Sequence, residues 1–308
     1  MGTLDGRVAI ITGAGRGLGR EHALLFAAEG AKIVVNDLGG ANDGSGSDMT
    51  PAQQTVADIK GMGGEAIVNT DNVADWDGAK RMIDSAIEAF GDLDILVNNA
   101  GILRDRVLVN MSESEWDSVI QVHLKGHFAP THHAAAYWRE QAKAGKEVYG
   151  RIINTTSVSG IYGNIGQTNY GAAKAGIASF TVIAALELAR FGVTVNAVAP
   201  VALTRMTEGL GNAPETDEER EMRSPRWIAP IVTWLAGNEA GDVTGRIFEA
   251  SGQTLAIAEG WHRGPSVSPI DDPTKLGPVV ADMLAKARPN AGMDGRDGSY
   301  PQNTLKKK

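Results

Sequence analysis

The amino-acid sequence predicts an α/β protein with a doubly wound, parallel seven-stranded sheet and helices on both faces. Short runs rich in β-branched residues alternate with longer Ala- and Leu-rich segments of helical period, which is typical of consecutive βαβ units. The 38 glycines agree with this class, because tight turns between strand and helix need residues without a Cβ atom. With 308 residues and 43% hydrophobic residues, the chain can bury a full core.

Seven segments are predicted to be the strands, since each is short and rich in β-branched residues. In a sheet of this kind ligands bind beyond the carboxyl ends of the strands, so polar residues at those ends are candidates for function. In chain order the predicted strands are residues 7–13, 31–37, 65–71, 93–101, 150–157, 193–200 and 245–252.

Residues 1–256 are expected to form one domain, and residues 257–308 a C-terminal extension. The extension is rich in Pro and Gly and has no interpretable pattern, so no fold is assigned to it. Another segment, residues 201–221, follows a predicted strand and mixes Gly, Pro and acidic residues. It is either a lid over the substrate or a plain surface loop.

Composition excludes several classes of partner and site. The net charge of −8 and isoelectric point near 5.3 argue against nucleic-acid binding, which needs a basic face to neutralise phosphates. The chain has no cysteine, so no disulfide or cysteine-ligated metal can form, and no metal site is predicted. We find no signal-peptide pattern and no apolar run of about 18 residues. We therefore expect a soluble, cytoplasmic protein without a nucleic-acid or membrane partner.

A glycine-rich stretch, TGAGRGLGRE, follows the first predicted strand and opens a helix. Its glycines Gly13, Gly17 and Gly19 allow a phosphate to approach the backbone, and a helix N-terminus offers unpaired N–H groups to a pyrophosphate. Asp37, at the end of the second strand, is placed to bind ribose hydroxyls. This context predicts a Rossmann-type dinucleotide site; the alternative is three turn glycines and a surface aspartate.

Asp37 also bears on the choice of cofactor. A carboxylate repels the 2′-phosphate of NADP, and the residues that follow offer no Arg to bind one, so NAD is predicted and NADP is less favoured. Arg16, inside the glycine loop, is the opposing signal, because a guanidinium there could reach a 2′-phosphate. The carboxylate is given more weight, since burying it against a phosphate dianion is costly.

Tyr170 and Lys174 lie four residues apart in the stretch QTNYGAAKAG. On a helix, residues with this spacing share a face and can project into one cleft. A phenol has a pKa of about 10 in water, and a nearby ammonium lowers it, which makes the pair a candidate acid/base catalyst. Ser157, at the end of the fifth predicted strand, could hydrogen-bond the reacting oxygen. The alternative is an ordinary helix with a packed tyrosine and an extended lysine.

These motifs together resemble the short-chain dehydrogenase/reductase family. TGAGRGLG, NNAG at Asn98 to Gly101, Ser157 and YGAAK occur in the family's order and spacing, over about residues 5–255. The resemblance implies that Tyr170 is the general acid/base, that Ser157 orients the substrate carbonyl, and that Lys174 binds the nicotinamide ribose and lowers the tyrosine pKa. It also implies hydride transfer between nicotinamide and a carbinol carbon, and assembly as a homodimer or homotetramer.

The same resemblance implies which residues bind the cofactor, with Asp71 near the adenine and Thr204 near the carboxamide. Two positions depart from the family pattern: His123 stands where an Asn of the proton relay is often found, and Val201 stands where Gly often follows Pro200. The implied cofactor contacts are Gly13, Arg16, Gly17, Leu18, Gly19, Asp37, Asp71, Asn72, Val73, Asn99, Ala100, Gly101, Tyr170, Lys174, Pro200 and Thr204.

Within the family, the motifs VVNDLGG, NNAGILRDR and VHLKGHF are most similar to the (3R)-hydroxyacyl-CoA dehydrogenase part of peroxisomal multifunctional enzymes, and bacterial enzymes of steroid catabolism share them. The resemblance implies an NAD(P)-dependent oxidoreductase acting on CH–OH groups, with a CoA thioester or a steroid as its small-molecule alcohol or ketone substrate. An NADP-dependent ketoacyl or carbonyl reductase is a further alternative. A non-catalytic, nucleotide-binding regulatory protein is the alternative of another class.

Overall fold

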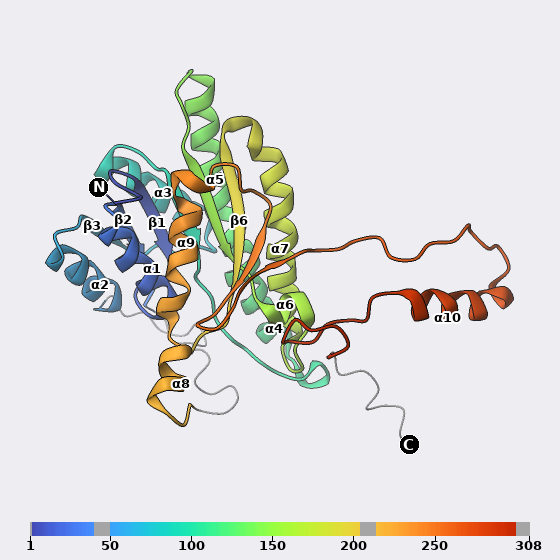
Figure 1. The fold of residues 1–308 in the computed structure, drawn as a ribbon. Helices are drawn as coiled ribbons and strands as arrows, with labels where there is room; N and C mark the ends of the chain where they lie inside the picture. The colour runs from blue at the N-terminus through green and yellow to red at the C-terminus, as the bar shows by residue number, and fades with distance from the viewer. Residues whose placement is uncertain (1, 40–49, 204–213, 300–308) are drawn as a thin grey trace. The chain divides into compact units, whose positions relative to one another are not determined.

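The computed structural model describes residues 2–39, 50–203 and 214–299. Contacts within the chain divide it into two units, residues 1–258 and 259–308. The first unit contains the whole β-sheet (Figure 1). The second unit, to which the sequence assigned no fold, contains one helix, α10 (Leu276–Lys286), among its described residues.

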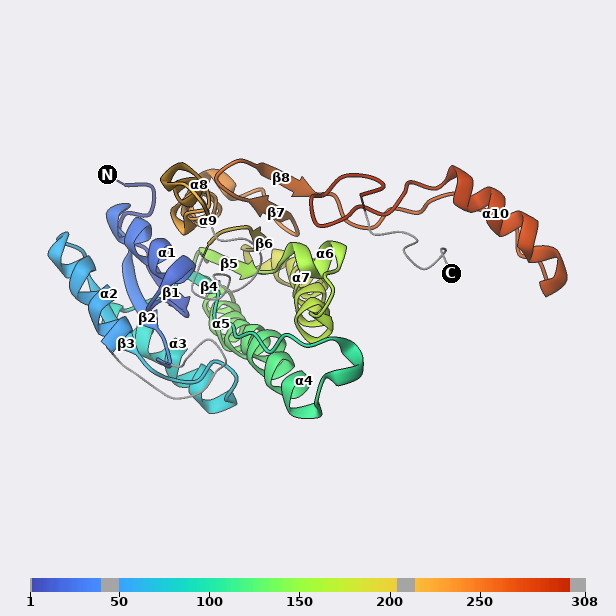
Figure 2. The same ribbon diagram turned by 90° about the horizontal axis from the view of Figure 1, so that it is seen from below.

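The sheet has eight strands in the order β3-β2-β1-β4-β5-β6-β7-β8 (Figure 2). All seven predicted strands are present and parallel, which confirms the doubly wound fold. The eighth strand was missed by the sequence analysis and pairs antiparallel with β7. The strands are β1 (Val8–Thr12), β2 (Lys32–Asn36), β3 (Ala66–Asn69), β4 (Ile95–Asn98), β5 (Gly150–Thr155), β6 (Val193–Pro200), β7 (Ile247–Ala250) and β8 (Leu255–Ala258).

The short length of β8 explains why it was missed. Its four residues LAIA return along β7 after a turn in which Ser251 N–H donates to the carbonyl oxygen of Thr254. Leu255 and Ile257 are exposed, so the strand lacks the pattern of one buried face from which a strand is recognised in sequence. It straddles the predicted domain boundary, and its last two residues, Ile257 and Ala258, were assigned to the extension.

Helices cover both faces of the sheet, and each face has its own apolar cluster. Successive side chains of a strand point to opposite faces, so Ile10 of β1 joins one cluster and Ile11 the other. The helices of the described residues are α1 (Gly17–Ala28), α2 (Thr50–Gly61), α3 (Trp76–Phe90), α4 (Glu113–Ile120), α5 (Gly126–Lys143), α6 (Val158–Tyr162), α7 (Thr168–Leu188), α8 (Asp217–Met222), α9 (Ala229–Ala236) and α10.

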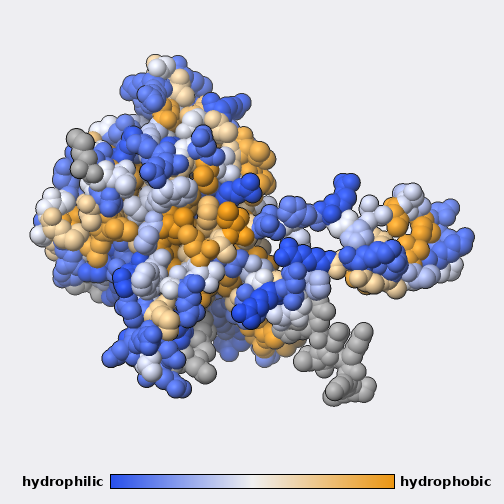
Figure 3. Space-filling view, viewed as in Figure 1, coloured by the Kyte–Doolittle hydropathy of each residue, from blue (hydrophilic) through white to orange (hydrophobic). Residues whose placement is uncertain are grey.

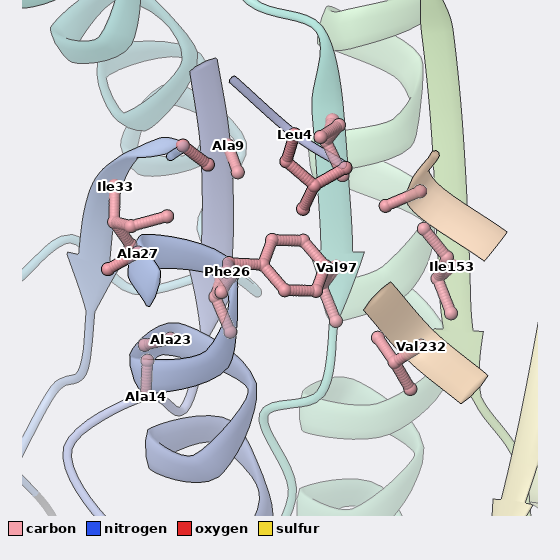
Figure 4. Packing of buried hydrophobic residues seen from close by; sticks show 14 of the residues in the cluster. Leu4, Ala9, Ala14, Ala23, Phe26, Ala27, Ile33, Val97, Ile153 and Val232 are labelled. Carbon is pink, nitrogen blue, oxygen red and sulfur yellow. The ribbon is translucent and has the colours of Figure 1, made fainter. Parts of the chain in front are cut away.

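One cluster is centred on Phe26 of α1, which is completely buried. Figure 4 shows its ring beside Val97 of β4, with Val232 of α9 and Ile153 of β5 beyond Val97 in the same cluster. Burying a side chain of this size contributes about 1.5–3 kcal/mol, so the contact holds the start of the chain against the middle of the sheet. Met82 of α3 belongs to the cluster on the other face.

The chain changes direction between β1 and β4. From β1 the chain runs outward through β2 and β3, and then returns so that β4 pairs with the other edge of β1, with Ala9 opposite Ile95. The connections after β1 and β4 therefore leave toward opposite faces, and a crevice opens between them at the carboxyl ends of the strands. This is the edge at which the sequence placed its candidate residues.

Candidate active site

The turn between β1 and α1 requires glycine, as Gly13 and Gly19 illustrate. Gly13 has φ +64°, in the region that favours glycine. A Cβ atom on Gly19 would lie 2.3 Å from the carbonyl oxygen of Gly13, so the helix could not approach the strand end so closely with any other residue. Arg16 gives α1 no side-chain cap, which leaves the first N–H groups of the helix for phosphate oxygens. This cradle fits the pyrophosphate of a dinucleotide.

Asp37 follows β2 and is directed at the same turn. Its carboxylate accepts hydrogen bonds from the N–H of Gly15 (2.8 Å) and the N–H of Gly39 (2.7 Å). The glycine loop and the end of β2 are thereby held together, and a carboxylate lies beside the cradle. Such an arrangement suits the binding of ribose hydroxyls.

The loop that follows β4 is tied to the end of β1. The hydroxyl oxygen of Thr12 accepts hydrogen bonds from the N–H groups of Asn99 (2.9 Å) and Ala100 (3.0 Å), and the side chain of Asn99 donates to the carbonyl oxygen of Thr12. Asn98 is buried and donates to Thr131 and Asn154. The NNAG motif therefore fixes the crevice between β1 and β4, on the side opposite to the glycine loop.

The remaining predicted cofactor residues are placed as follows. Asp71 forms an ion pair with Arg81 at 2.7 Å, and Val73 is buried against Gly126, while Asn72 is exposed. Leu18 packs against the cluster that contains Phe26. Gly17 lies at the start of α1, Gly101 follows β4, and Pro200 ends β6. Thr204 lies outside the described residues.

Ser157, Tyr170 and Lys174 are brought together from β5 and α7. Ser157 follows β5, begins α6, and forms a hydrogen bond with the Tyr170 side chain. The Nζ atom of Lys174 lies 5.5 Å from the centre of the Tyr170 ring and donates to the carbonyl oxygen of Thr155 at 2.6 Å. Tyr170 and Lys174 share one face of α7, as their spacing predicted.

Burial dominates the electrostatics of this group. It raises the pKa of Tyr170 to about 12, a change that the hydrogen bond with Ser157 opposes and the charge of Asp105 reinforces. Burial also lowers the pKa of Lys174 to about 7. The expected lowering of the tyrosine pKa by an adjacent ammonium is not found, because both groups lose hydration and each charged form is disfavoured.

His123 lies in a π-helical turn, residues Gln121–Lys125, between α4 and α5. Its ring contacts the Tyr170 ring edge-on at 5.1 Å, and its Nε2 atom lies 2.7 Å from the carbonyl oxygen of Ile102. A Cβ on Gly101 would lie 2.3 Å from this ring, so the glycine of NNAG makes room for the histidine. Burial lowers the pKa of His123 to about 3, which makes it neutral at physiological pH.

Two residues at the end of β5 that bind α7 were missed by the sequence analysis. Thr156 donates from its hydroxyl to the backbone carbonyl of Lys174 at 2.7 Å, and Asn154 donates to Thr181 two turns further along α7. Two hydrogen bonds therefore hold the end of β5 against α7, the helix that carries Tyr170 and Lys174. The signal was present in the polar strand ending NTTS, but only the serine was interpreted.

A cavity of about 500 Å³ opens at the carboxyl edge of the sheet, beside the residue that follows β6. None of Ser157, Tyr170 and Lys174 lines it, so the cavity shares the carboxyl edge of the sheet with these residues but does not enclose them. Its lining residues are Val201, Glu215, Glu219, Met222, Arg223, Ser251 and Gln253.

Comparison with known proteins decides the family. Residues 7–215 match the family model described as short chain dehydrogenase. The chain belongs to the short-chain dehydrogenase family. The family binds NAD or NADP, and the protein is an oxidoreductase that acts on CH–OH groups.

Individual proteins of the short-chain dehydrogenase family are similar to this chain over most of its length. The chain is 40% identical over 301 residues to hydroxyacyl-CoA dehydrogenase ChsB1 of Mycobacterium tuberculosis, covering 96% of this chain and 93% of that one. It is 47% identical over 273 residues to peroxisomal multifunctional enzyme type 2 of Drosophila melanogaster, covering 88% of this chain but only 44% of the insect protein. A short chain dehydrogenase from Mycobacterium avium has a similar structure, with a TM-score of 0.85 and 53% identity, covering 94% and 99% of the two chains.

Proposed function

We propose that this protein is an NAD-dependent dehydrogenase that oxidises the hydroxyl group of a (3R)-hydroxyacyl-CoA to a ketone. The observation that carries the proposal of catalysis is the convergence of Ser157, Tyr170 and Lys174 at the crevice beside the glycine cradle. The substrate class is supported by the relatives named as hydroxyacyl-CoA dehydrogenase and peroxisomal multifunctional enzyme.

In the proposed reaction the Tyr170 phenolate removes the hydroxyl proton of the alcohol substrate. The hydrogen on the carbinol carbon of the substrate leaves as hydride. A cofactor bound at the glycine cradle would supply the nicotinamide ring as the acceptor of that hydride. Ser157 donates a hydrogen bond to the same substrate oxygen, which orients it toward the phenol. Lys174 binds the nicotinamide ribose; beside the bound cofactor its ammonium favours the phenolate form of Tyr170.

The proposal of NAD as cofactor rests on Asp37. Its carboxylate already accepts hydrogen bonds from the N–H of Gly15 in the cradle and from the N–H of Gly39 after β2, so a 2′-phosphate there meets a fixed negative charge. Arg16, at the start of α1, supports the second candidate, an NADP-dependent reductase, because a guanidinium beside the cradle can pair with a 2′-phosphate. Comparing the dissociation constants of NADH and NADPH separates the two, and a preference for NADPH contradicts the first proposal.

The first experiment is an absorbance assay of NADH formation with (3R)-hydroxyacyl-CoAs of several chain lengths and, in parallel, with 3- and 17-hydroxysteroids. We expect turnover with the CoA thioesters. Turnover with the steroids alone supports the steroid dehydrogenase instead. NAD binding without oxidation of any alcohol supports the non-catalytic reading.

Replacing Tyr170 with Phe tests the mechanism. We expect Tyr170→Phe to lower kcat by a factor on the order of 10²–10⁴ and to leave the dissociation constant of NADH unchanged, because the phenol transfers a proton but is not needed to hold the cofactor. The matched control is Tyr137→Phe, which should keep full activity. The hydroxyl of Tyr137, in α5, donates to Asp92 at 2.7 Å, and Asp92 precedes β4, away from the carboxyl ends of the strands. Full activity of Tyr170→Phe on the best substrate contradicts the mechanism.

A further inference from the structure

The loop after β4 is bound to the beginning of α7 at two neighbouring residues. The side chain of Asn169 donates to the carbonyl oxygen of Arg104 at 2.9 Å. The side chain of Gln167 donates from Nε2 to Oδ2 of Asp105 at 2.7 Å. Gln167 is 5% exposed and directly precedes the helix. The loop therefore fixes the point at which α7 begins, two residues before Tyr170.

Asp105 is more than a partner for Gln167. Its other carboxylate oxygen, Oδ1, is buried and has no hydrogen-bond partner among the described residues. An unsatisfied buried carboxylate oxygen is costly for stability, so packing alone does not account for an acidic residue here. The charge of Asp105 acts instead on Tyr170, since it disfavours a second negative charge on the phenol.

Three further side chains face Tyr170 from the elements packed around it, and none of them is acidic. His123, from the π-helical turn, contacts the ring edge-on at 5.1 Å and is neutral, because burial lowers its pKa to about 3. Lys174, one turn along α7, has its Nζ atom 5.5 Å from the ring centre. Ser157 supplies an uncharged hydroxyl from the end of β5. Within the described residues, Asp105 is thus the acidic group whose charge acts on the phenol.

We propose that Asp105 is a positioning residue that sets the pH range in which Tyr170 exchanges its proton with the substrate. It does so by holding Gln167 at the start of α7 and by keeping a negative charge close to the phenol. Burial keeps Tyr170 protonated in the free enzyme, and the carboxylate of Asp105 adds to this effect by disfavouring the phenolate. The proposal rests on the proposed function, in which Tyr170 is the acid/base.

The test is Asp105→Asn, which removes the charge while its side-chain oxygen can still accept the hydrogen bond from Gln167. The phenolate then loses a repulsive neighbour, so the pKa of Tyr170 falls. We expect the ascending limb of kcat/KM against pH, measured for alcohol oxidation, to move to lower pH by on the order of one unit. Asp105→Glu retains the charge and should retain the original midpoint.

The control is Glu115→Gln in α4. Glu115 is also acidic, but its carboxylate is bound to Arg106 and to Ser112, and glutamine preserves that helix cap. The midpoint should not move in this variant. An unchanged midpoint in Asp105→Asn, or an equal shift in Glu115→Gln, overturns the proposal.

A second readout does not depend on turnover. A fluorinated tyrosine placed at position 170 has a more acidic phenol, whose titration fluorine NMR follows in the enzyme without substrate. Its midpoint should fall in Asp105→Asn and stay in Glu115→Gln. If no alcohol is oxidised but the NMR midpoint moves, the proposed function fails while the influence of Asp105 on the phenol stands. If the NMR midpoint does not move, the inference is wrong whatever the substrate.

Discussion

Lys174 is 2% exposed, and among the described residues its ammonium donates one hydrogen bond, to the carbonyl oxygen of Thr155. A cation in such a place is destabilising in the free enzyme, which is why its pKa falls to about 7. Spacing in the sequence predicted that the lysine and Tyr170 share a face. It could not predict their pKa values, because these depend on burial by segments distant in the chain, including the end of β5.

The buried lysine has a measurable effect on stability. In the unfolded chain Lys174 titrates near its ordinary pKa of 10.5 and in the folded chain near 7, so between these values the unfolded state binds the extra proton. Stability should therefore rise with pH over this window, by about 1 kcal/mol per unit from this residue, and the full cost should be present below pH 7.

Lys174→Met removes this dependence. We expect the variant to be the more stable protein at pH 6, and the difference from the native protein to shrink by pH 9. Urea unfolding at the two pH values measures both. Equal pH slopes for the two proteins contradict the assignment of a lowered pKa to Lys174.

At the scale of elements, the local pattern of residues predicted the buried parallel strands but not the exposed edge strand. Seven strands were predicted from β-branched runs, because a parallel strand buried on both faces is apolar along most of its length, as Val8–Thr12 is up to its last residue. β8 was missed because it is a short antiparallel edge strand with exposed Leu255 and Ile257. The glycine loop was recognised from its position between strand and helix, and the same approach would have missed Asp105, whose partner Gln167 lies far along the chain.

The turn between β1 and α1 gives a prediction at the scale of an element. Gly19→Ala places a methyl group 2.3 Å from the carbonyl oxygen of Gly13, so the turn must open. We expect the dissociation constant of NADH, measured by fluorescence titration, to rise by about tenfold or more, since the N–H groups of α1 no longer converge on the pyrophosphate.

The matched control is Gly61→Ala at the end of α2. A Cβ atom there meets nothing within 4 Å, and its φ is not in the left-handed region. Alanine should leave NADH binding unchanged and slightly stabilise the helix. Equal affinity of the Gly19→Ala and native proteins for NADH shows that the cradle does not bind the cofactor.

On the scale of the whole molecule, α7 has one face buried against the sheet and another apolar face exposed. Ala184 and Ala185 are buried against the sheet, whereas Ile183 and Leu186 are 52% and 77% exposed. Figure 3 shows apolar residues gathered on the surface where α7 lies. Residues 168–191 are long and apolar enough to be a candidate membrane span by composition, the single such helix among the described residues. Since this helix also packs on the sheet, we propose that its outer face contacts a second copy of the chain.

Leu186→Asp tests this contact. We expect the native protein to sediment as a homodimer or homotetramer and Leu186→Asp to sediment as a smaller species at the same concentration, because a buried charge opposes association. Met62→Asp, an exposed apolar position beyond the end of α2, should leave the assembly unchanged. A monomeric native protein, or an unaffected Leu186→Asp assembly, contradicts the proposal.

The order of the strands also determines how the protein must fold during synthesis. β1 can pair with β2 as soon as both have left the ribosome, but its other edge has no partner until β4 follows, since Ala9 pairs with Ile95. Through that interval the emerging chain carries an apolar strand with one open edge, which is prone to misassociation with other chains. Closing such distant pairs is intrinsically slow. The crevice between β1 and β4 can therefore form only after β4 has been synthesised, so a chain halted before Ile95 has no complete cofactor site.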